Sequence, residues 1–356
     1  MDYISAREAA DKWGISQRRV EILCAESRIP YATMVGNMWI IPASADKPSD
    51  ARKVRCIGRD DNAGKPFLKW AGGKGQLLKD IGALYPFDSV NITKYAEPFV
   101  GGGAVLFDIL NRYELEQVYI NDINYELINT YLVIKNNAHE LLDVLYKYQE
   151  EFIPLEHDSR KEYFSHKRER FNELKINFSA ERRIELAALM IFLNKTCFNG
   201  LYRVNKKGFY NVPMGKYKNP LICDEKNILL ISDKLCQVKI DCGSYKQCLP
   251  FVDAETFVYF DPPYRPLTST ASFTSYTEGS FYDEDQRELA EFVTAVDDKE
   301  ALFVLSNSDP KNVDADDNFF DELYKGYNIK RIGANRMINS KGSKRGRVTE
   351  LLISNF

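Results

Sequence analysis

The chain has 356 residues, a formal net charge of −3 and 28% charged residues, a composition that is ordinary for a globular protein. This length exceeds one typical domain, so one large domain with a small additional one is expected. No apolar stretch approaches the roughly 20 residues that span a bilayer, and the first residues lack a secretory pattern, which predicts a cytoplasmic protein. Seven cysteines without a Cys-x-x-Cys pair and only three histidines argue against a disulfide framework or a metal centre.

The first part of the chain, residues 1–46, predicts a helix-turn-helix followed by a small wing. Residues 6–13 are helix-forming, Gly14 ends that helix, and Ser16 is a suitable N-cap for a second helix. Residues 33–41, with a Gly-Asn pair at their centre, predict a two-stranded hairpin.

This arrangement resembles the small winged-helix DNA-binding domains of the excisionase and MerR type. The resemblance implies that the second helix and its surroundings contact DNA. The implied contact residues are Gln17, Arg18, Arg19 and Arg28. Short helix pairs also arise as plain scaffolding, which is the alternative interpretation of this segment.

The rest of the chain predicts a linker and then an alternating α/β domain. Residues 47–64 are rich in Asp, Lys, Ser and Pro without a periodic apolar pattern, so they are predicted to be the linker. The predicted strands are 94–96, 117–121, 256–260 and 301–306, followed by an edge hairpin near 327–332 and 347–354. The predicted helices are 104–110, material within 126–193, and 285–296. This order predicts a doubly wound, Rossmann-like α/β sheet.

One strand end carries the most informative motif, Asp-Pro-Pro-Tyr at residues 261–264. It follows an apolar run that predicts a buried strand stopped by two prolines, and open α/β sheets bind ligands at such strand ends. An exocyclic aromatic amine is a poor nucleophile until acceptors draw on its N–H groups. Asp261 and the carbonyl of Pro262 are candidate acceptors, and the ring of Tyr264 can stack. A plain strand followed by a Pro-Pro turn is the alternative.

A glycine cluster at residues 101–103 follows a predicted strand and opens a predicted helix, where missing side chains let a nucleotide-like cofactor approach the backbone. It is not a dinucleotide fingerprint, because Leu106 stands where a third small residue belongs. Lys74 does not belong to a phosphate loop either, because a glycine follows it in place of Ser or Thr. A cofactor with adenosine but no phosphate remains, and Asp122 suits its ribose hydroxyls. Structural tight turns are the alternative for each glycine motif.

Charge is unevenly distributed, and two windows contain no Asp or Glu. The first window is residues 186–223. In it, Lys and Arg alternate with aromatic residues and asparagines, which suits a surface that holds phosphates and reaches bases. Residues 334–349 carry five basic residues. Two such windows in an acidic chain favour a nucleic-acid partner over the alternative of solvated loops.

Taken in order, five segments resemble those of the Dam-type DNA adenine-N6 methyltransferases, the alpha group of the D12 class. These segments are residues 67–74, 97–103, 121–124, 194–203 with 209–213, and 261–264 with 273–276. The resemblance implies an S-adenosylmethionine-dependent methyltransferase domain over residues 65–356. It also implies a mostly helical target-recognition insertion at about 135–245. An Asp rather than a Ser at position 261 favours adenine over cytosine-N4 as the target.

Carried over position by position, the resemblance implies the site residues. The implied cofactor contacts are Trp70, Lys74, Phe99, Gly101, Gly103, Asp122 and Asp261. Asp261, Pro262 and Tyr264 would hold an adenine extruded from the duplex. The implied DNA contacts are Lys69, Phe198, Asn199, Leu201, Arg203, Pro213 and Lys216. S-adenosylmethionine is the implied methyl donor, and no metal is implied.

The target sequence that the recognition segment implies is GATC. Gly103 and Lys216 stand where the family varies, so another target is left open. The resemblance also implies that Phe198 and Asn199 wedge into the space left by the flipped base, and Phe198 stands where the family often has Tyr, which could add a polar contact. The implied partner is double-stranded DNA, and a monomer is favoured. If the enzyme belongs to a restriction-modification system, its second partner would be a restriction endonuclease that acts on the same sites.

Two alternative functions remain. One is a related amino-methyltransferase with another DNA sequence or an RNA as its target. The other is a DNA-binding regulator in which an inactive methyltransferase fold supports the N-terminal domain. The intact acid, prolines and tyrosine of residues 261–264 argue against the second alternative.

Overall fold

The computed structural model describes residues 3–14, 17–25, 29, 31–36, 38–45, 63–70, 72–265, 281–335 and 347–356. Contacts between residues divide the chain into two compact units, Met1–Ile57 and Gly58–Phe356. Within these described ranges, no helix combines the length and the apolar character needed to cross a membrane.

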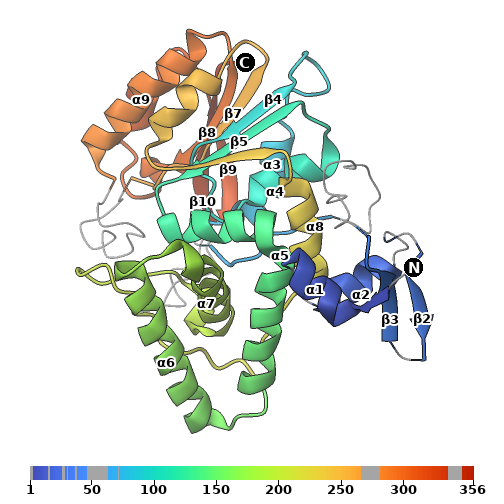
Figure 1. Cartoon of the computed structure of the whole chain (residues 1–356). Coiled ribbons are helices and arrows are strands. Elements are labelled where there is room, and N and C mark those ends of the chain that lie inside the picture. Colours follow the sequence, from blue (N-terminus) through green and yellow to red (C-terminus); the bar gives the residue numbers. More distant parts are fainter. Residues whose placement is uncertain are drawn as a thin grey trace. The chain divides into compact units, whose positions relative to one another are not determined.

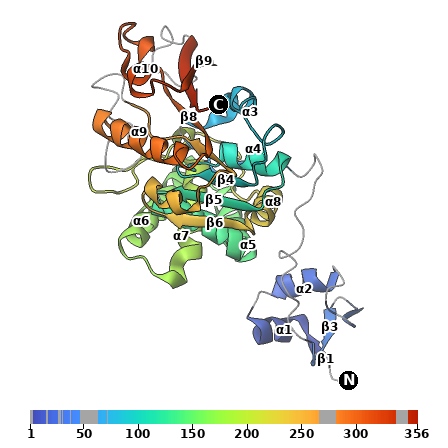
Figure 2. The ribbon, with the colours of Figure 1, turned by 90° about the horizontal axis from the view of Figure 1, so that it is seen from above.

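The described part of the N-terminal unit contains two helices and a small antiparallel sheet (Figure 2). Its elements are β1 (Tyr3–Ser5), α1 (Ala6–Trp13), α2 (Gln17–Ala25), β2 (Thr33–Val35) and β3 (Met38–Pro42). Strand β3 lies between β1 and β2 and pairs with both. Ala9 of α1 packs with Val20 and Leu23 of α2 and with Ile41 of β3, so this unit has its own core.

The ends of α1 show why the first helix forms where the sequence predicts it. The N–H of Ser5 donates to the Glu8 carboxylate at 2.8 Å, and the N–H of Glu8 donates to Ser5 Oγ at 3.2 Å, which caps the first turn. Gly14 ends the helix with φ of +65°, a conformation that costs glycine little. Ser16 and Arg28 lie outside the described residues, as does the side chain of Arg19.

The second unit is built on a sheet with the strand order β6-β5-β4-β7-β8-β10-β9. The strands are β4 (Lys94–Glu97), β5 (Gln117–Asp122), β6 (Val238–Cys242), β7 (Thr256–Phe260), β8 (Leu302–Ser308), β9 (Asn328–Asn335) and β10 (Arg347–Ser354). The first five in spatial order are parallel, whereas β10 pairs antiparallel with both β8 and β9. The predicted mostly parallel α/β sheet and its edge hairpin are confirmed.

Helices cover both faces of this sheet and form a further helical layer beside it (Figure 1). The helices of this unit are α3 (Leu78–Gly82), α4 (Ala104–Arg112), α5 (Tyr125–Phe152), α6 (His157–Ile176), α7 (Arg183–Thr196), α8 (Glu225–Leu235), α9 (Asp283–Asp297) and α10 (Phe319–Leu323). Short 3-10 turns occur at Lys74–Gln76, Ala180–Arg182, Phe198–Gly200, Tyr245–Phe251 and Pro310–Asn312. The predicted helical material within 126–193 is therefore three helices, α5, α6 and α7, which pack together.

Successive residues of the central strands enter two different cores, because side chains alternate across a strand. Tyr259 of β7 joins one core with Val105 of α4, while Val258 and Phe260 join the other with Leu289 of α9. All five residues of β7 are buried. A strand covered on both faces has a continuous apolar run, which is the pattern that predicted β7.

Two strands were missed in the sequence. β6 lies inside residues 135–245, predicted to be an inserted helical domain, yet it pairs with β5 in the central sheet. Residues 238–242 of that range therefore belong to the central sheet. Only Val238 of this edge strand is buried, so its apolar signal is weak. β1 has three residues, too few to show a period.

Candidate active site

Three neighbouring parallel strands, β4, β5 and β7, end at the same edge of the sheet. Glu97 is the last residue of β4, Asp122 is the last residue of β5, and Asp261 directly follows β7. Because the carboxyl ends of neighbouring parallel strands face one crevice, acidic residues far apart in the sequence meet here.

Lys74 and Asp261 form an ion pair at this edge. Lys74 Nζ lies 2.6 Å from Asp261 Oδ1, and the two side chains are 4% and 23% exposed. Lys74 Nζ also donates to the carbonyl of Gly72 at 3.0 Å. Ser306 Oγ of β8 donates to the same oxygen of Asp261 at 3.1 Å. The structure thus brings a predicted cofactor residue and a predicted catalytic residue together, and Ser306 is a partner that the sequence did not reveal.

Tyr264 completes this cluster. Lys74 Nζ lies 4.6 Å from the centre of the Tyr264 ring, a cation–π contact. Tyr264 Oη donates to the Glu350 carboxylate of β10 at 2.6 Å. Burial, aided by the carboxylates of Asp261 and Glu350, raises the pKa of Tyr264 well above its usual value, so the phenol is a neutral donor. Pro262 is buried within the same turn.

The glycine turn after β4 packs against Trp70. Gly101 has φ of +48°, and a Cβ there would lie 3.0 Å from Trp70 Cδ1. A Cβ at Gly102 would lie 2.9 Å from Trp70 Cβ. At Gly103, with φ of +71°, a Cβ would meet Tyr131 Oη at 2.5 Å. Close packing therefore requires these glycines, in addition to the role in cofactor approach that the sequence predicts.

Asp122 ties the end of β5 to the glycine turn. Its Oδ2 accepts the N–H of Gly101 at 3.0 Å, and its Oδ1 accepts the N–H of Asn124 at 2.9 Å. Burial raises the pKa of Asp122, and these backbone donors oppose that rise. The predicted ribose-binding acid and the predicted glycine motif are thus one hydrogen-bonded unit.

Glu97 is a buried acid that is not among the residues predicted for the site. It is 2% exposed, and it accepts a hydrogen bond from Tyr95 Oη at 2.8 Å. Burial raises the pKa of Glu97 well above its usual range, although the hydrogen bond from Tyr95 opposes this rise. An acid as the last residue of a strand, just before a proline, was the available signal.

Aromatic side chains pack around the strand ends. The ring of Phe99 stacks on Tyr245 with 5.1 Å between ring centres. Trp70 stacks on Tyr202 with 5.4 Å between ring centres. Tyr202 belongs to the segment predicted to contact DNA, so Trp70 touches both the glycine turn and that segment.

Lys69 is fastened to the same segment by Asn194. The N–H of Lys69 donates to Asn194 Oδ1 at 2.9 Å, and Asn194 Nδ2 donates to the carbonyls of Lys69 at 2.8 Å and Gly200 at 2.9 Å. The side chain of Lys69 passes so close to Gly200 that a Cβ there would lie 2.5 Å from Lys69 Cδ. The structure therefore brings Lys69 together with the other predicted DNA contacts.

The exposed tip of this segment holds Phe198 and Asn199. The Phe198 side chain is 51% exposed, and Asn199 has a left-handed backbone with φ of +56°. The N–H of Phe198 donates to the carbonyl of Pro213 at 2.9 Å, which joins the two ends of the segment. Leu201 is half-buried and Pro213 is exposed.

Arg203 is exposed and oriented by Asn211. Arg203 Nε donates to Asn211 Oδ1 at 2.8 Å, and its guanidinium also donates to the Asn211 carbonyl at 3.4 Å. Asn211, which the sequence suggests only as one of several asparagines on a nucleic-acid surface, thus orients Arg203.

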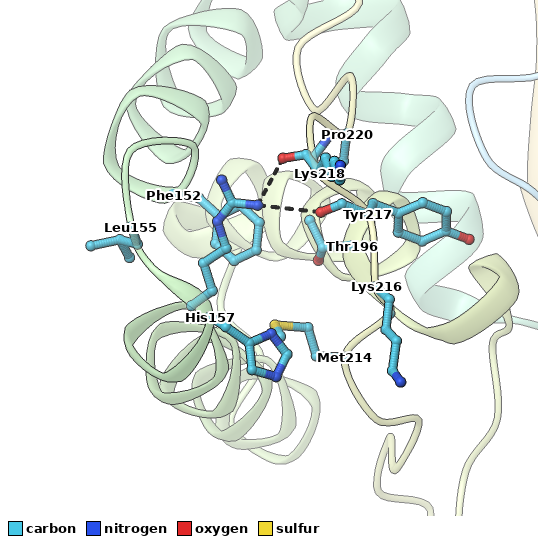
Figure 3. A pocket seen from close by; sticks show the side chains of 11 residues that line it. Phe152, Leu155, His157, Thr196, Met214, Lys216, Tyr217, Lys218 and Pro220 are labelled. Atoms are coloured by element: carbon cyan, nitrogen blue, oxygen red, sulfur yellow. Dashed lines mark hydrogen bonds between the residues drawn. The ribbon is translucent and has the colours of Figure 1, made fainter.

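A cavity of about 530 Å³ lies beside the exposed residue Lys216, next to the start of α6 (Figure 3). Arg160 Nη1 donates to the carbonyls of Tyr217 at 3.2 Å and Lys218 at 2.8 Å, and so fixes part of its wall. The residues that line it include no Asp or Glu and none of the predicted cofactor or catalytic residues. The cavity is therefore separate from the strand-end cluster of Lys74, Asp261 and Tyr264.

The aromatic residues of the first acid-free window divide between core and surface. Phe192, Tyr202 and Tyr210 are buried, so the expectation that the aromatics of this window lie on a nucleic-acid surface is wrong for these three. They pack into the core beneath the segment. Residues 273–276 of the catalytic region and most of the second acid-free window lie outside the described residues.

Comparison with known proteins shows the family of this chain. A model of the D12 class of N6 adenine-specific DNA methyltransferases matches residues 70–338. The type II methyltransferase M.MjaIII of Methanocaldococcus jannaschii is 51% identical over 295 residues, which cover 82% of this chain and 99% of that protein. The type II methyltransferase M1.LlaDCHI of Lactococcus lactis subsp. cremoris is 39% identical, covering 82% of this chain and 95% of that protein.

The DNA adenine methylase of Escherichia coli strain K12 is 34% identical, covering 81% of this chain and 94% of that protein. The residues matched by the family model include Lys74, Asp261 and Tyr264 as well as Arg203. The chain therefore belongs to the D12 class of N6 adenine-specific DNA methyltransferases, enzymes that methylate adenine in DNA site-specifically.

Proposed function

We propose that this methyltransferase transfers the methyl group of S-adenosylmethionine to N6 of an adenine that is flipped out of duplex DNA, within the sequence GATC. The observation that carries the catalytic part is the cluster at the end of β7. There, Asp261 is held by Lys74 at 2.6 Å and by Ser306 at 3.1 Å, directly before two prolines and Tyr264.

The cofactor would bind at the ends of β4 and β5. Family membership implies S-adenosylmethionine as the methyl donor. The residues proposed to contact it are Trp70, Lys74, Phe99, Gly101, Gly103, Asp122 and Asp261. The donor set suits this molecule, because Asp122 is an acid fixed by two backbone N–H groups and can accept from ribose hydroxyls. Lys74 supplies a positive charge for the carboxylate of the methionine part.

Catalysis would rest on position and on hydrogen-bond acceptors. The Asp261 carboxylate and the Pro262 carbonyl would accept from the N6 amino group and stabilise the positive charge that develops on nitrogen. The ring of Tyr264 would contact the flipped base. The displacement at the methyl group is in line, so the alignment of the two reactants accounts for much of the rate. Flipping costs on the order of a few kcal/mol, which contacts to the base and phosphates offset.

The recognition segment, residues 194–203 with 209–213, would contact the bases of the duplex. The proposed DNA contacts are Lys69, Phe198, Asn199, Leu201, Arg203, Pro213 and Lys216. The exposure of Phe198 and Asn199 at one tip supports a wedge that fills the space left by the flipped base. Arg203 presents a guanidinium fork suited to guanine. The choice of GATC rests on the resemblance of this segment to that of the Dam-type enzymes.

We further propose that the N-terminal unit adds DNA contacts or regulates expression. Its helix pair and hairpin support this interpretation. M.MjaIII and M1.LlaDCHI are named type II methyltransferases, which supports a restriction endonuclease with the same target as a partner of this system.

The test is transfer of labelled methyl groups from S-adenosylmethionine to two duplexes that differ only in whether GATC is intact or scrambled. Label is expected in the GATC duplex only. Equal label in both duplexes would overturn the assignment of the target sequence. Label in RNA or in neither nucleic acid would support the alternative functions instead.

A further inference from the structure

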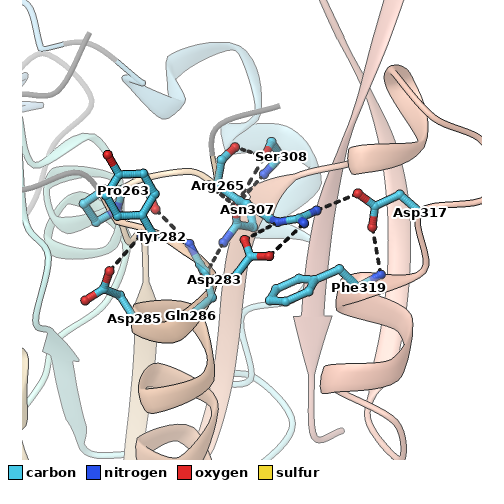
Figure 4. Close-up of polar contacts among 10 residues, drawn as sticks. All are labelled: Pro263, Arg265, Tyr282, Asp283, Asp285, Gln286, Asn307, Ser308, Asp317 and Phe319. Carbon is cyan, nitrogen blue, oxygen red and sulfur yellow. Dashed lines mark hydrogen bonds and ion pairs between the residues drawn. The ribbon is translucent and has the colours of Figure 1, made fainter. Parts of the chain in front are cut away.

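A pair of buried amides stands behind the turn that follows Asp261. Gln286 lies on α9 and Asn307 on β8, and both are 0% exposed (Figure 4). Gln286 Nε2 donates to the carbonyl of Pro263 at 3.1 Å. Asn307 Nδ2 donates to Gln286 Oε1 at 3.0 Å, and Asn307 Oδ1 accepts the N–H of Arg265 at 3.4 Å.

The partners at the two ends leave each amide only one orientation. The carbonyl of Pro263 can only accept, so Gln286 must turn its NH₂ group toward it and its oxygen toward Asn307. Asn307 must then donate to Gln286 and present its own oxygen to the N–H groups of Arg265 and Ser308, the latter at 2.8 Å. The chain of donors and acceptors is consistent from end to end and buried, where unpaired polar groups are costly.

These contacts hold the two peptide planes on either side of Tyr264. The Pro263 carbonyl belongs to the plane before Tyr264, and the Arg265 N–H belongs to the plane after it, so both backbone dihedral angles of Tyr264 are fixed. The ring of Pro263 fixes its own φ, and proline offers no N–H by which the turn could be tied. The carbonyl of Pro262 lies one peptide plane before the anchored Pro263 carbonyl, and because φ of Pro263 is fixed by its ring, only ψ of Pro263 separates the two planes.

We propose that Gln286 and Asn307 are positioning residues for methyl transfer, which set the direction of the Pro262 carbonyl and of the Tyr264 ring without touching either reactant. This inference rests on the proposed roles of Asp261, Pro262 and Tyr264.

Arg265, on the same turn, forms ion pairs that hold its side chain rather than the backbone. Arg265 Nε lies 2.6 Å from Asp283, and its Nη1 lies 2.6 Å from Asp317 (Figure 4). These contacts restrain the side chain of Arg265, whereas the amides hold the backbone. The hydrogen bonds between the partners raise the pKa of Arg265 and lower that of Asp283, so neither group titrates near neutral pH.

The first test variant is Gln286→Met, which keeps the length of the side chain and removes the donor to Pro263. We expect kcat to fall on the order of tenfold to a hundredfold, because small misplacements of reacting groups have effects of this size. The KM for S-adenosylmethionine and the Kd for the GATC duplex should change little. Gln149→Met is the control, since the Gln149 side-chain amide likewise ties down a loop backbone, but away from the strand ends: its Oε1 accepts the N–H groups of Ile222 and Cys223, both at 3.1 Å. Its kcat should stay near that of the wild type.

The second variant, Gln286→Glu, gives a pH-dependent readout that is taken per folded molecule. The folded fraction is measured by circular dichroism at each pH, because a buried carboxyl also lowers the stability of the fold as the pH rises. A protonated carboxyl can donate to Pro263 and accept from Asn307 in the same geometry, whereas a carboxylate can only accept. The ratio of its kcat to that of the wild type should therefore fall as the pH rises from about 6 to 9, since burial raises the pKa of a carboxyl into this range. If Gln286→Met does not fold, the pH dependence of the kcat ratio between Gln286→Glu and the wild type is the test of the positioning role.

Each outcome separates this inference from the proposed function. If Asp261→Ala is inactive while Gln286→Met matches Gln149→Met in kcat, or the Gln286→Glu ratio does not change with pH, only the positioning role is wrong. If the wild type methylates no DNA or Asp261→Ala remains active, the proposed function itself fails. A fall in kcat for Gln286→Met with unchanged binding supports the inference.

Discussion

The pair of Lys74 and Asp261 places opposite charges 2.6 Å apart where little water reaches either. Removing one partner from such a pair leaves an uncompensated charge, which typically costs about 3 to 5 kcal/mol when the pair is fully buried. Asp261 is 23% exposed, so the cost here is smaller. Before it can bind N6 of adenine, Asp261 must keep an oxygen free of Lys74, and Ser306 shares the oxygen that Lys74 contacts. The second oxygen of Asp261 is therefore the one best placed to accept from the base.

Asp261→Ala should abolish methyl transfer and leave most of the DNA affinity. Loss of a hydrogen-bonding group that stabilises a developing charge costs on the order of 10²- to 10³-fold in kcat. Single-turnover methylation and equilibrium binding to a GATC duplex measure the two effects. Asp253→Ala is the control, because it breaks another Asp–Lys pair, to Lys94 at 2.7 Å, and should leave kcat unchanged. Undiminished turnover of Asp261→Ala would remove Asp261 from the mechanism.

Glu97→Gln should stabilise the protein, and increasingly so with rising pH. Burial raises the pKa of Glu97 in the folded state, while the unfolded chain loses this proton above about pH 4.3. Between the two pKa values the unfolded state binds fewer protons, so the free energy of unfolding of the wild type falls as the pH rises. The glutamine variant has no such titrating group. Its free energy of unfolding relative to that of the wild type should therefore grow by up to about 1.4 kcal/mol per pH unit.

Urea unfolding of both proteins at several pH values measures this difference. Tyr95→Phe is a second variant for comparison. It removes the hydrogen bond that Tyr95 Oη donates to Glu97 at 2.8 Å, so it should lower the free energy of unfolding at every pH. A difference between wild type and Glu97→Gln that does not depend on pH would show that Glu97 is ionised in the folded state.

Single residues differ in how far the sequence predicts them. Asp261 and Asp122 are evident because each stands at the end of an apolar run, and Lys74 because glycines surround it. Ser306, Glu350 and Gln286 carry no such mark. Their contacts with residues 261–265 arise only when β7, β8, β10 and α9 assemble, and pairings across the sheet are not written in local sequence.

At the scale of elements, the recognition segment is a loop whose ends are closed by hydrogen bonds. The N–H of Phe198 meets the carbonyl of Pro213, and Arg203 is held by Asn211. Asn194 fastens this loop to Lys69 from inside α7. A loop fixed in this way can present side chains to a duplex with little loss of conformational freedom on binding.

Arg203→Ala should relax the preference for one base pair of the target by about 1 to 3 kcal/mol. Relative kcat/KM values on duplexes with single changes at each position of GATC measure this loss. Lys206→Ala, in the same exposed loop, is the control and should weaken binding to all sequences alike if it contacts a phosphate. Equal loss on every sequence for Arg203→Ala would reclassify Arg203 as a phosphate contact.

The elements themselves show where sequence patterns succeed. β7 and β8 are buried on both sides, and α9 has a clear apolar face, so their residues predict them. The three helices within residues 125–196 were predicted only as helical material, because apolar side chains face several neighbours and mask the breaks. β6 was missed because an edge strand needs few apolar residues.

At the scale of the whole molecule, the chain forms two compact units, and the proposed site residues are not shared between them. Every described residue proposed for cofactor binding, catalysis and target reading belongs to the second unit, Gly58–Phe356. M.MjaIII is covered over 99% of its length by 82% of this chain, so that relative has almost nothing that corresponds to the remainder. Methyl transfer should therefore not require the N-terminal unit, whose role would lie in binding.

Deleting residues 1–46 should lower duplex affinity and leave kcat at saturating DNA unchanged. A second DNA-binding unit on the same chain acts at a high effective concentration, so its loss should weaken binding on the order of tenfold or more. Fewer phosphate contacts should also make the affinity less dependent on salt. Fluorescence anisotropy with GATC duplexes at several salt concentrations measures both effects. Arg18→Ala in the full chain should shift affinity in the same direction by a smaller amount. If affinity, salt dependence and binding to the promoter of its own gene all stay unchanged in the deletion variant, the N-terminal unit is not a DNA-binding domain.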